Sequence, residues 1–125
     1  MNSVLWGAAL ILVALFLPAG LLKLLTPYDK IVNGPWPWAG DFSPLTIKAA
    51  GTLEVLACIG LVVPPLVDIA PWLTPLAAVG LICMMTGAFY THIRREEHHL
   101  LLINAPLLVL AIVVAWGRFG PYRFA

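Results

Sequence analysis

The residue in this sequence that is best suited to chemistry is Glu54, because it lies inside a long apolar stretch. Glu54 is the only charged residue between Lys48 and Asp68. A charged side chain near the centre of a bilayer costs about 2.5–3.5 kcal/mol on insertion scales, so such residues face the interior of a helix bundle and mark a functional site. A carboxyl group in that position can hold or pass a proton, or orient a polar group of a ligand.

Three further polar residues are predicted to lie near Glu54: Lys23, His92 and Asn104. If successive helices run up and down, Lys23 falls near the end of the first helix, His92 near the end of the third, and Asn104 one turn into the fourth. Glu54 lies about 14 Å from the same side of the membrane at 1.5 Å per residue. All of them fall in the same half of the bilayer, so we predict a polar cavity whose catalytic residues are Glu54, His92 and Lys23. Asn104 is predicted to bind substrate.

Each of these residues also has a structural interpretation. Glu54 could belong to a buried ion pair that fixes the register of two helices. Lys23, close to a helix end, could extend its ammonium group to the lipid headgroups. Asn104 could form a hydrogen bond between helices. These alternatives stay open at the level of the sequence.

The composition indicates a membrane protein of one domain, residues 1–125. Of its 125 residues, 62% are hydrophobic and 10% are charged, whereas soluble domains carry about 25% charged residues. The net charge of +1 gives no electrostatic footprint for nucleic acid, so membrane lipid is the expected partner and nucleic acid is not. The N-terminal stretch lacks a basic region and a clear cleavage site, so we interpret it as a retained first helix.

The predicted fold is an all-α, up-down bundle of transmembrane helices. A spanning helix needs about 20 largely apolar residues, and four segments meet this requirement, at about residues 4–25, 45–64, 72–94 and 100–117. The second is expected to end at Pro64 and Pro65, because proline lacks the backbone N–H that a continuing helix needs. The charged segment 94–99 is interpreted as a solvated turn, and its adjacent His98 and His99 do not face the same way, so no metal site is predicted.

A long connection, TPYDKIVNGPWPWAGDFSP, joins the first two predicted helices and is rich in aromatic residues, Pro and Gly. Aromatic side chains of this density are typical of the membrane–water interface, and long loops are often lids or binding segments. We predict that Trp36 and Trp38 of this loop contact substrate, together with Tyr90 near the end of the third helix. An interfacial anchor without a ligand role is an equally compatible interpretation.

Several short motifs follow one another along the chain in a characteristic order. They are GLLKL at residues 20–24, GTLE at 51–54, GLVVP at 60–64, LTPLAA at 73–78, GAFYTHIRR at 87–95 and WGRF at 116–119. Their order and spacing resemble the DoxX-like family of small four-helix integral membrane proteins. The resemblance implies four transmembrane helices and carries over Lys23, Glu54, His92 and Arg118 as the polar positions of the family's motifs. Arg118 is therefore also predicted to bind substrate.

The resemblance further implies an association with thiosulfate:quinone oxidoreduction, or with membrane oxidoreductase complexes concerned with thiol and oxidative stress. Cys58 and Cys83 lack CxxC spacing, which argues against direct thiol–disulfide chemistry in this chain. No intrinsic cofactor motif is present, so electron transfer would need a partner or a cofactor.

We therefore expect the cavity to bind a quinone or a similar lipophilic molecule, as part of a membrane oxidoreductase system. The expected location is the bacterial inner (plasma) membrane. Two alternatives remain: an acid–base enzyme (isomerase, hydrolase or cyclase) acting on a lipophilic substrate, and a non-catalytic accessory subunit of a membrane complex. Either a protein partner or a homo-oligomer is compatible with the sequence.

Overall fold

The computed structural model describes residues 2–34 and 36–121, which form helices and no strands. The long helices are α1 (Asn2–Leu25), α3 (Pro44–Val67), α4 (Leu73–Arg94) and α5 (His98–Phe119). A short helix, α2 (Tyr28–Val32), and a 3-10 helix, η1 (Pro37–Asp41), lie between α1 and α3. All four long helices are long and apolar enough to cross a membrane. The predicted all-α bundle of spanning helices is confirmed.

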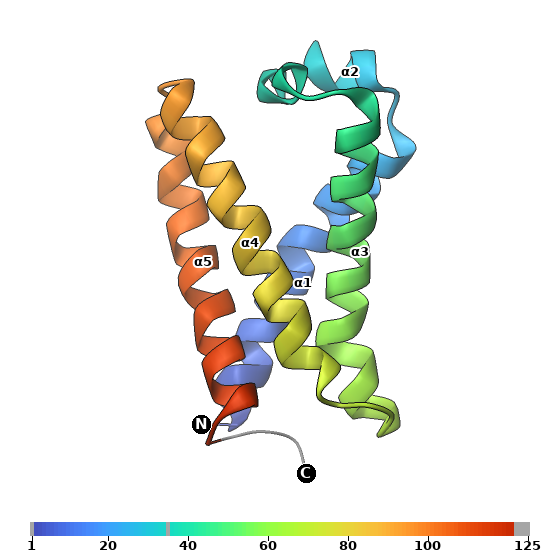
Figure 1. Cartoon of the computed structure of the whole chain (residues 1–125), viewed down its shortest axis with the longest axis vertical. Coiled ribbons are helices and arrows are strands. Elements are labelled where there is room, and N and C mark those ends of the chain that lie inside the picture. The colour runs from blue at the N-terminus through green and yellow to red at the C-terminus, as the bar shows by residue number, and fades with distance from the viewer. Residues whose placement is uncertain (1, 35, 122–125) are drawn as a thin grey trace.

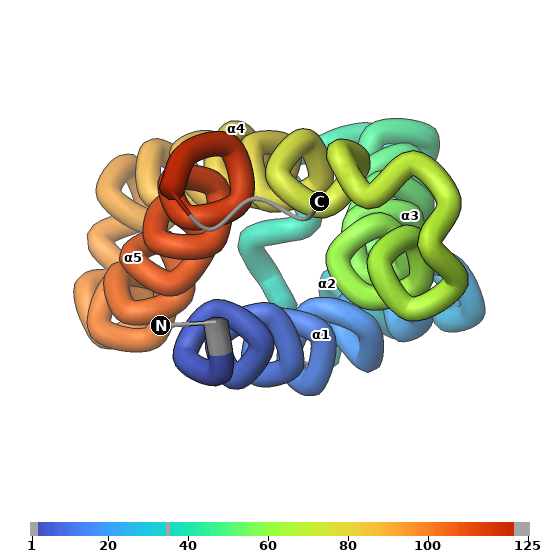
Figure 2. The backbone as a smooth tube through the Cα atoms, turned by 90° about the horizontal axis from the view of Figure 1, so that it is seen from below, coloured from blue at the N-terminus to red at the C-terminus, as the bar shows by residue number. Residues whose placement is uncertain are grey.

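The four long helices form a ring in which each packs against two neighbours (Figures 1 and 2). The closest associations are between α1 and α3 and between α4 and α5, so the bundle consists of two helix pairs. The pairs lie close together at the end that carries the α3–α4 turn, and they separate toward the end that carries α2 and η1 (Figure 1). This divergence leaves space between the pairs at one end only.

The convergent end is held by close helix contacts and a compact apolar core. A Cβ atom at Gly117 of α5 would lie only 2.6 Å from Cδ1 of Leu5 in α1, so any larger residue would make the Leu5 side chain move. The buried core residues come from all four long helices and include Leu12, Leu61, Leu81, Ala111 and Val114. This core fixes the two pairs relative to each other below the divergent end.

The prediction that the second spanning helix ends at Pro64 is wrong, because α3 continues to Val67. Prolines at 64 and 65 leave the carbonyl groups of Gly60 and Leu61 without a donor in their own helix. The hydroxyl group of Thr74, which is buried, donates to the Gly60 oxygen at 3.1 Å and lies 3.4 Å from the Leu61 oxygen. A side chain of α4 thus satisfies the backbone groups that the prolines leave open.

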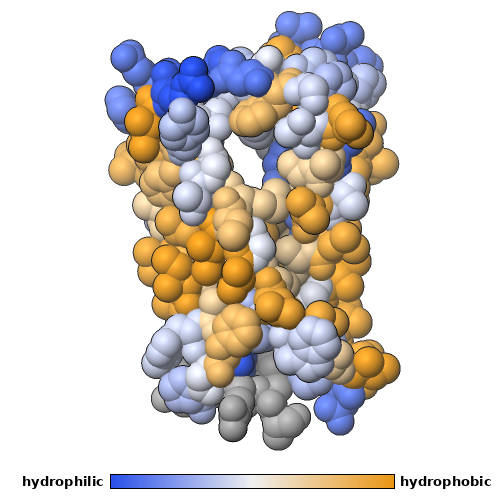
Figure 3. All heavy atoms as spheres, in the orientation of Figure 1, coloured by the Kyte–Doolittle hydropathy of each residue, from blue (hydrophilic) through white to orange (hydrophobic). Residues whose placement is uncertain are grey.

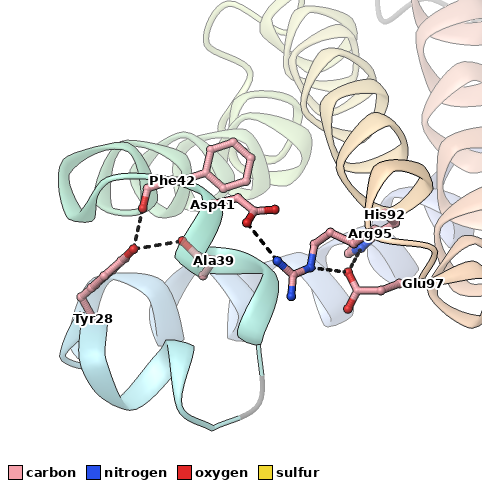
Figure 4. A network of polar contacts seen from close by, with 7 residues as sticks. All are labelled: Tyr28, Ala39, Asp41, Phe42, His92, Arg95 and Glu97. Carbon is pink, nitrogen blue, oxygen red and sulfur yellow. Dashed lines mark hydrogen bonds and ion pairs between the residues drawn. The ribbon is translucent and has the colours of Figure 1, made fainter.

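The aromatic connection is a folded unit, which we call the interfacial segment (residues 27–34 and 36–43). The hydroxyl group of Tyr28 donates to the backbone oxygen of Phe42 at 2.6 Å and lies 3.3 Å from that of Ala39 (Figure 4). Ile31 and Ala39 are buried against Ile47 of α3. The segment is therefore packed onto the start of α3 and covers the divergent end of the bundle.

Candidate functional site

A cavity of about 860 Å³ lies between the two helix pairs, beneath the interfacial segment. Small-molecule sites commonly measure about 300–1,000 Å³. Its wall is apolar toward the middle of the bundle and polar near the interfacial segment. The apolar part includes Leu15, Phe16, Met84, Met85 and Leu107, and the polar part Lys23, Glu54, His92, Glu97 and Asn104. The shape and chemistry of this wall suit a molecule with a polar head and an apolar body.

Lys23 and Glu54 form a buried ion pair on the α1–α3 side of the cavity. The Lys23 ammonium group donates a hydrogen bond to Oε1 of Glu54, and the two residues are 7% and 3% exposed. The pair is possible because α1 and α3 approach each other closely at small residues. A Cβ atom at Gly51 would lie 2.8 Å from Cβ of Lys23 and 2.9 Å from the backbone oxygen of Gly20. The glycines of the two sequence motifs thus position the charged residues beside them.

Two indole rings of the interfacial segment cover the ammonium group of Lys23. Its Nζ atom lies 5.3 Å from the ring centroid of Trp36 and 5.6 Å from that of Trp38. A cation at this distance is attracted by the negative face of an aromatic ring. The charge of Lys23 is therefore held between a carboxylate on one side and two aromatic rings on the other.

The ion pair with Lys23 uses only one of the two carboxylate oxygens of Glu54. Its Oε2 atom is buried and has no hydrogen-bond partner among the residues that the structure describes, although Glu54 lines the cavity. A buried acceptor without a donor is costly, and such atoms in native proteins need an explanation. A ligand or a water molecule in the cavity that donates a hydrogen bond to Oε2 would remove this cost.

His92 lies on the α4–α5 side and is also buried. Its Nδ1 atom is 3.3 Å from Oε1 of Glu97, and its ring meets that of Trp38 edge-on at 5.8 Å. A carboxylate beside Nδ1 favours a proton on that nitrogen and leaves Nε2 as the acceptor of the neutral ring. Neither Nε2 of His92 nor the side-chain amide of Asn104, which also lines the cavity, has a hydrogen-bond partner within the described ranges. The α4–α5 pair therefore offers polar groups to the same space.

An ion-pair network joins the interfacial segment to the α4–α5 turn across the end of the cavity (Figure 4). Arg95 donates to Asp41 at 2.9 Å and to Glu97 at 3.2 Å, and Glu97 in turn meets His92. The interpretation of residues 94–99 as only a solvated turn missed this role. Glu97 was detectable in principle, since it lies close to His92 in sequence, but nothing near Asp41 in the sequence indicates its distant partner.

The structure separates Arg118 from the other predicted site residues. Arg118 is buried near the far end of α5, with its guanidinium carbon 5.9 Å from the ring of Trp6. It lies about 30 Å along α5 from His98, at 1.5 Å per residue, and does not line the cavity. Tyr90 does line the cavity, but at its outer edge, because the residue is 64% exposed and its ring faces the guanidinium group of Arg94.

Comparison with known proteins identifies the family of this chain. The sequence matches the DoxX-like family over residues 7–114, which is most of the chain. The protein belongs to the DoxX-like family. The part of this DoxX-like protein that matches contains Lys23, Glu54, His92, Asn104 and the interfacial segment, and ends before Arg118. No curated protein and no solved structure matches the chain.

Proposed function

We propose that this DoxX-like protein binds a quinone, or a lipophilic molecule with a similar polar head, in the cavity between its helix pairs. The observation that carries the proposal is the unpaired, buried acceptor Oε2 of Glu54, a residue of the cavity wall, beside the ammonium group of Lys23. An ammonium group has three N–H donors, of which one is directed at Glu54. A quinone carbonyl can accept from another, and a quinol hydroxyl can donate to Oε2.

The rest of the wall fits the same class of ligand. The indole rings of Trp36 and Trp38 offer flat apolar surfaces beside the polar groups. Leu15, Phe16 and Met85 continue the cavity as an apolar wall. Ligand sites of this kind are mostly apolar and use a few polar groups to fix orientation.

Within a membrane oxidoreductase system, these residues would bind the polar head of the quinone and exchange protons with it. Glu54 would accept at Oε2, His92 would accept or donate at Nε2, and Lys23 would hold a carbonyl oxygen. Electrons would come from a protein partner or a separate cofactor. A bacterial inner membrane and an assembly with another subunit are part of this proposal.

One observation also favours an acid–base enzyme acting on a lipophilic substrate. Glu54 and His92 come from different helix pairs and line one cavity, so a carboxyl group and an imidazole could act on one substrate as general base and general acid. Such an enzyme would show a bell-shaped dependence of turnover on pH. A flat profile would count against this second candidate.

The experiment that tests quinone binding compares three proteins in native lipid discs by mass spectrometry and absorbance spectroscopy. They are the wild type, Glu54→Gln and the control Glu96→Gln, which makes the same chemical change in the exposed turn outside the cavity. We expect a quinone to copurify with the wild type and the control and to be lost from Glu54→Gln.

Loss of a buried anion leaves Lys23 without its partner, so folding is checked with the double variant Lys23→Gln/Glu54→Gln, in which neither charge remains. If Glu54→Gln loses quinone only in proportion to folded protein, the pair is structural. If no protein carries more than bulk lipid, the quinone proposal fails.

A further inference from the structure

We propose that the cavity opens sideways into the bilayer between α3 and α4, and that the ligand's apolar chain leaves over Gly87. This inference rests on the proposed function and deepens it. It assigns the ligand to the class of membrane-dissolved molecules whose chain is longer than the cavity. Such a ligand would enter from the lipid and leave its chain there when the head is bound.

The opening is defined by residues that both line the cavity and face the outside. On the α3–α4 side these are Thr46, Gly87 and Tyr90, all of them exposed. Figure 3 shows an aperture in this region, beneath the end of the molecule that carries α2 and η1. Together with the aperture, these exposed lining residues place an opening between α3 and α4.

Gly87 leaves a gap in this edge of the opening. A Cβ atom at Gly87 would have no atom within 4 Å, so the missing side chain leaves free space at the edge of the opening. Gly87 lies about 10 Å from Arg94 along α4, at 1.5 Å per residue. The hydrocarbon core of a bilayer is about 30 Å thick, and α4 is long enough to span it. The opening therefore faces acyl chains rather than water.

The cavity is also open between α1 and α5, because the aperture in Figure 3 passes through the molecule and the lining residues Leu15, His99 and Ile103 are exposed. Between α1 and α5 the exposed lining residues include Leu15 and Ile103, whose side chains are large and apolar. At the end of the bundle, the interfacial segment and the ion pair between Asp41 and Arg95 cover the cavity. Among the exposed lining residues of the two sides, only Gly87, which lies beside Thr46 and Tyr90 on the α3–α4 side, has no side chain, so the chain of the ligand is expected to leave over it.

The test uses two probes with the same dimethoxy-methyl-benzoquinone head, one without a side chain and one with a decyl chain. Binding of each is titrated by native mass spectrometry on protein in lipid discs. The variant Gly87→Leu places a side chain in the opening. The matched control is Gly80→Leu, because a Cβ at Gly80 also meets nothing within 4 Å but Gly80 does not line the cavity.

We expect Gly87→Leu to weaken binding of the decyl probe on the order of ten-fold, because the added side chain and the decyl chain would compete for one space. The probe without a chain should bind the variant as it binds the wild type, and Gly80→Leu should change neither. Unchanged binding of the decyl probe by Gly87→Leu, or equal weakening of both probes, overturns the inference. Failure of the wild type to bind either probe overturns the proposed function itself, and this inference with it.

A second measurement does not depend on any variant. A decyl probe with a diazirine at the end of its chain is photolysed when bound, and the labelled peptides are mapped. Labelling within residues 44–67 and 73–94 supports the exit between α3 and α4. Labelling confined to residues 2–25 and 98–119 contradicts it.

Discussion

Arg95, which follows α4, donates from Nη1 to Oδ1 of Asp41 in the interfacial segment at 2.9 Å, although the two residues are 54 positions apart. Asp41 belongs to the unit packed on the α1–α3 pair, and Arg95 belongs to the α4–α5 pair. The ion pair therefore joins the two halves of the bundle at the end where they diverge (Figure 4).

The first prediction concerns this ion pair. Replacing Arg95 with Gln should lower the free energy of unfolding by no more than about 1 kcal/mol, because both side chains are partly exposed to solvent. It should instead raise the rate of backbone hydrogen exchange at Ala39 and Phe42, whose amides are bonded within the interfacial segment. Arg94→Gln is the control, since Arg94 faces Tyr90 and not Asp41. Equal exchange in both variants would show that the ion pair does not hold the segment.

The second prediction concerns the buried pair of Lys23 and Glu54. Lys23→Met leaves the Glu54 carboxylate without its cation, which costs about 3–5 kcal/mol for a buried pair. The double variant Lys23→Met/Glu54→Gln removes both charges and should recover much of this loss. Thermal unfolding followed by circular dichroism in detergent measures the stability of Lys23→Met, Glu54→Gln and the double variant. If the double variant is destabilised by the sum of the two single changes, the residues are not coupled.

The sequence predicts how deep each residue lies in the membrane better than it predicts which residues of other helices that residue contacts. Hydropathy fixes where each helix lies, and the rise per residue then places Lys23, Glu54, His92 and Asn104 in one half of the bilayer. The same reasoning puts Arg118 in the other half, and only its place in a family motif grouped it with the rest. Rotation of each helix about its axis, which decides which side chains meet, depends on packing at small residues such as Gly51.

The contact between the exposed side chains of Asp41 and Arg95 could not be predicted from the sequence, for a different reason. The residues next to Asp41 and Arg95 in the sequence are typical of any exposed turn. Whether the two side chains meet depends on how the interfacial segment folds onto α3. Likewise, the hydroxyl group that bonds the carbonyl groups left open by the prolines of α3 comes from another helix. In both cases the deciding partner lies on a different element, so no local pattern could reveal it.

The third prediction tests that hydroxyl group. Thr74→Val keeps the shape of the side chain and removes the donor to the carbonyl groups of Gly60 and Leu61. Leaving a buried acceptor unsatisfied costs about 1–3 kcal/mol, so the free energy of unfolding should fall by this amount. Thr86→Val is the control, because the Thr86 hydroxyl is exposed and bonds to the Ile82 oxygen of its own helix. Similar losses in the two variants would contradict a special role for Thr74.

The fourth prediction concerns the tautomer of His92. Glu97 lies 3.3 Å from Nδ1, and a carboxylate at this position favours the neutral ring with its proton on Nδ1. In Glu97→Ala the preference should weaken, and the ¹⁵N chemical shifts of the His92 ring should move toward the tautomer protonated at Nε2. Glu96→Ala, which removes a neighbouring carboxylate outside the cavity, should leave those shifts unchanged. Because Nε2 faces the ligand in the proposed site, Glu97→Ala should also weaken quinone binding. A shift in the ring signals without any change in binding would separate His92 from ligand recognition and leave Glu97 with a structural role alone.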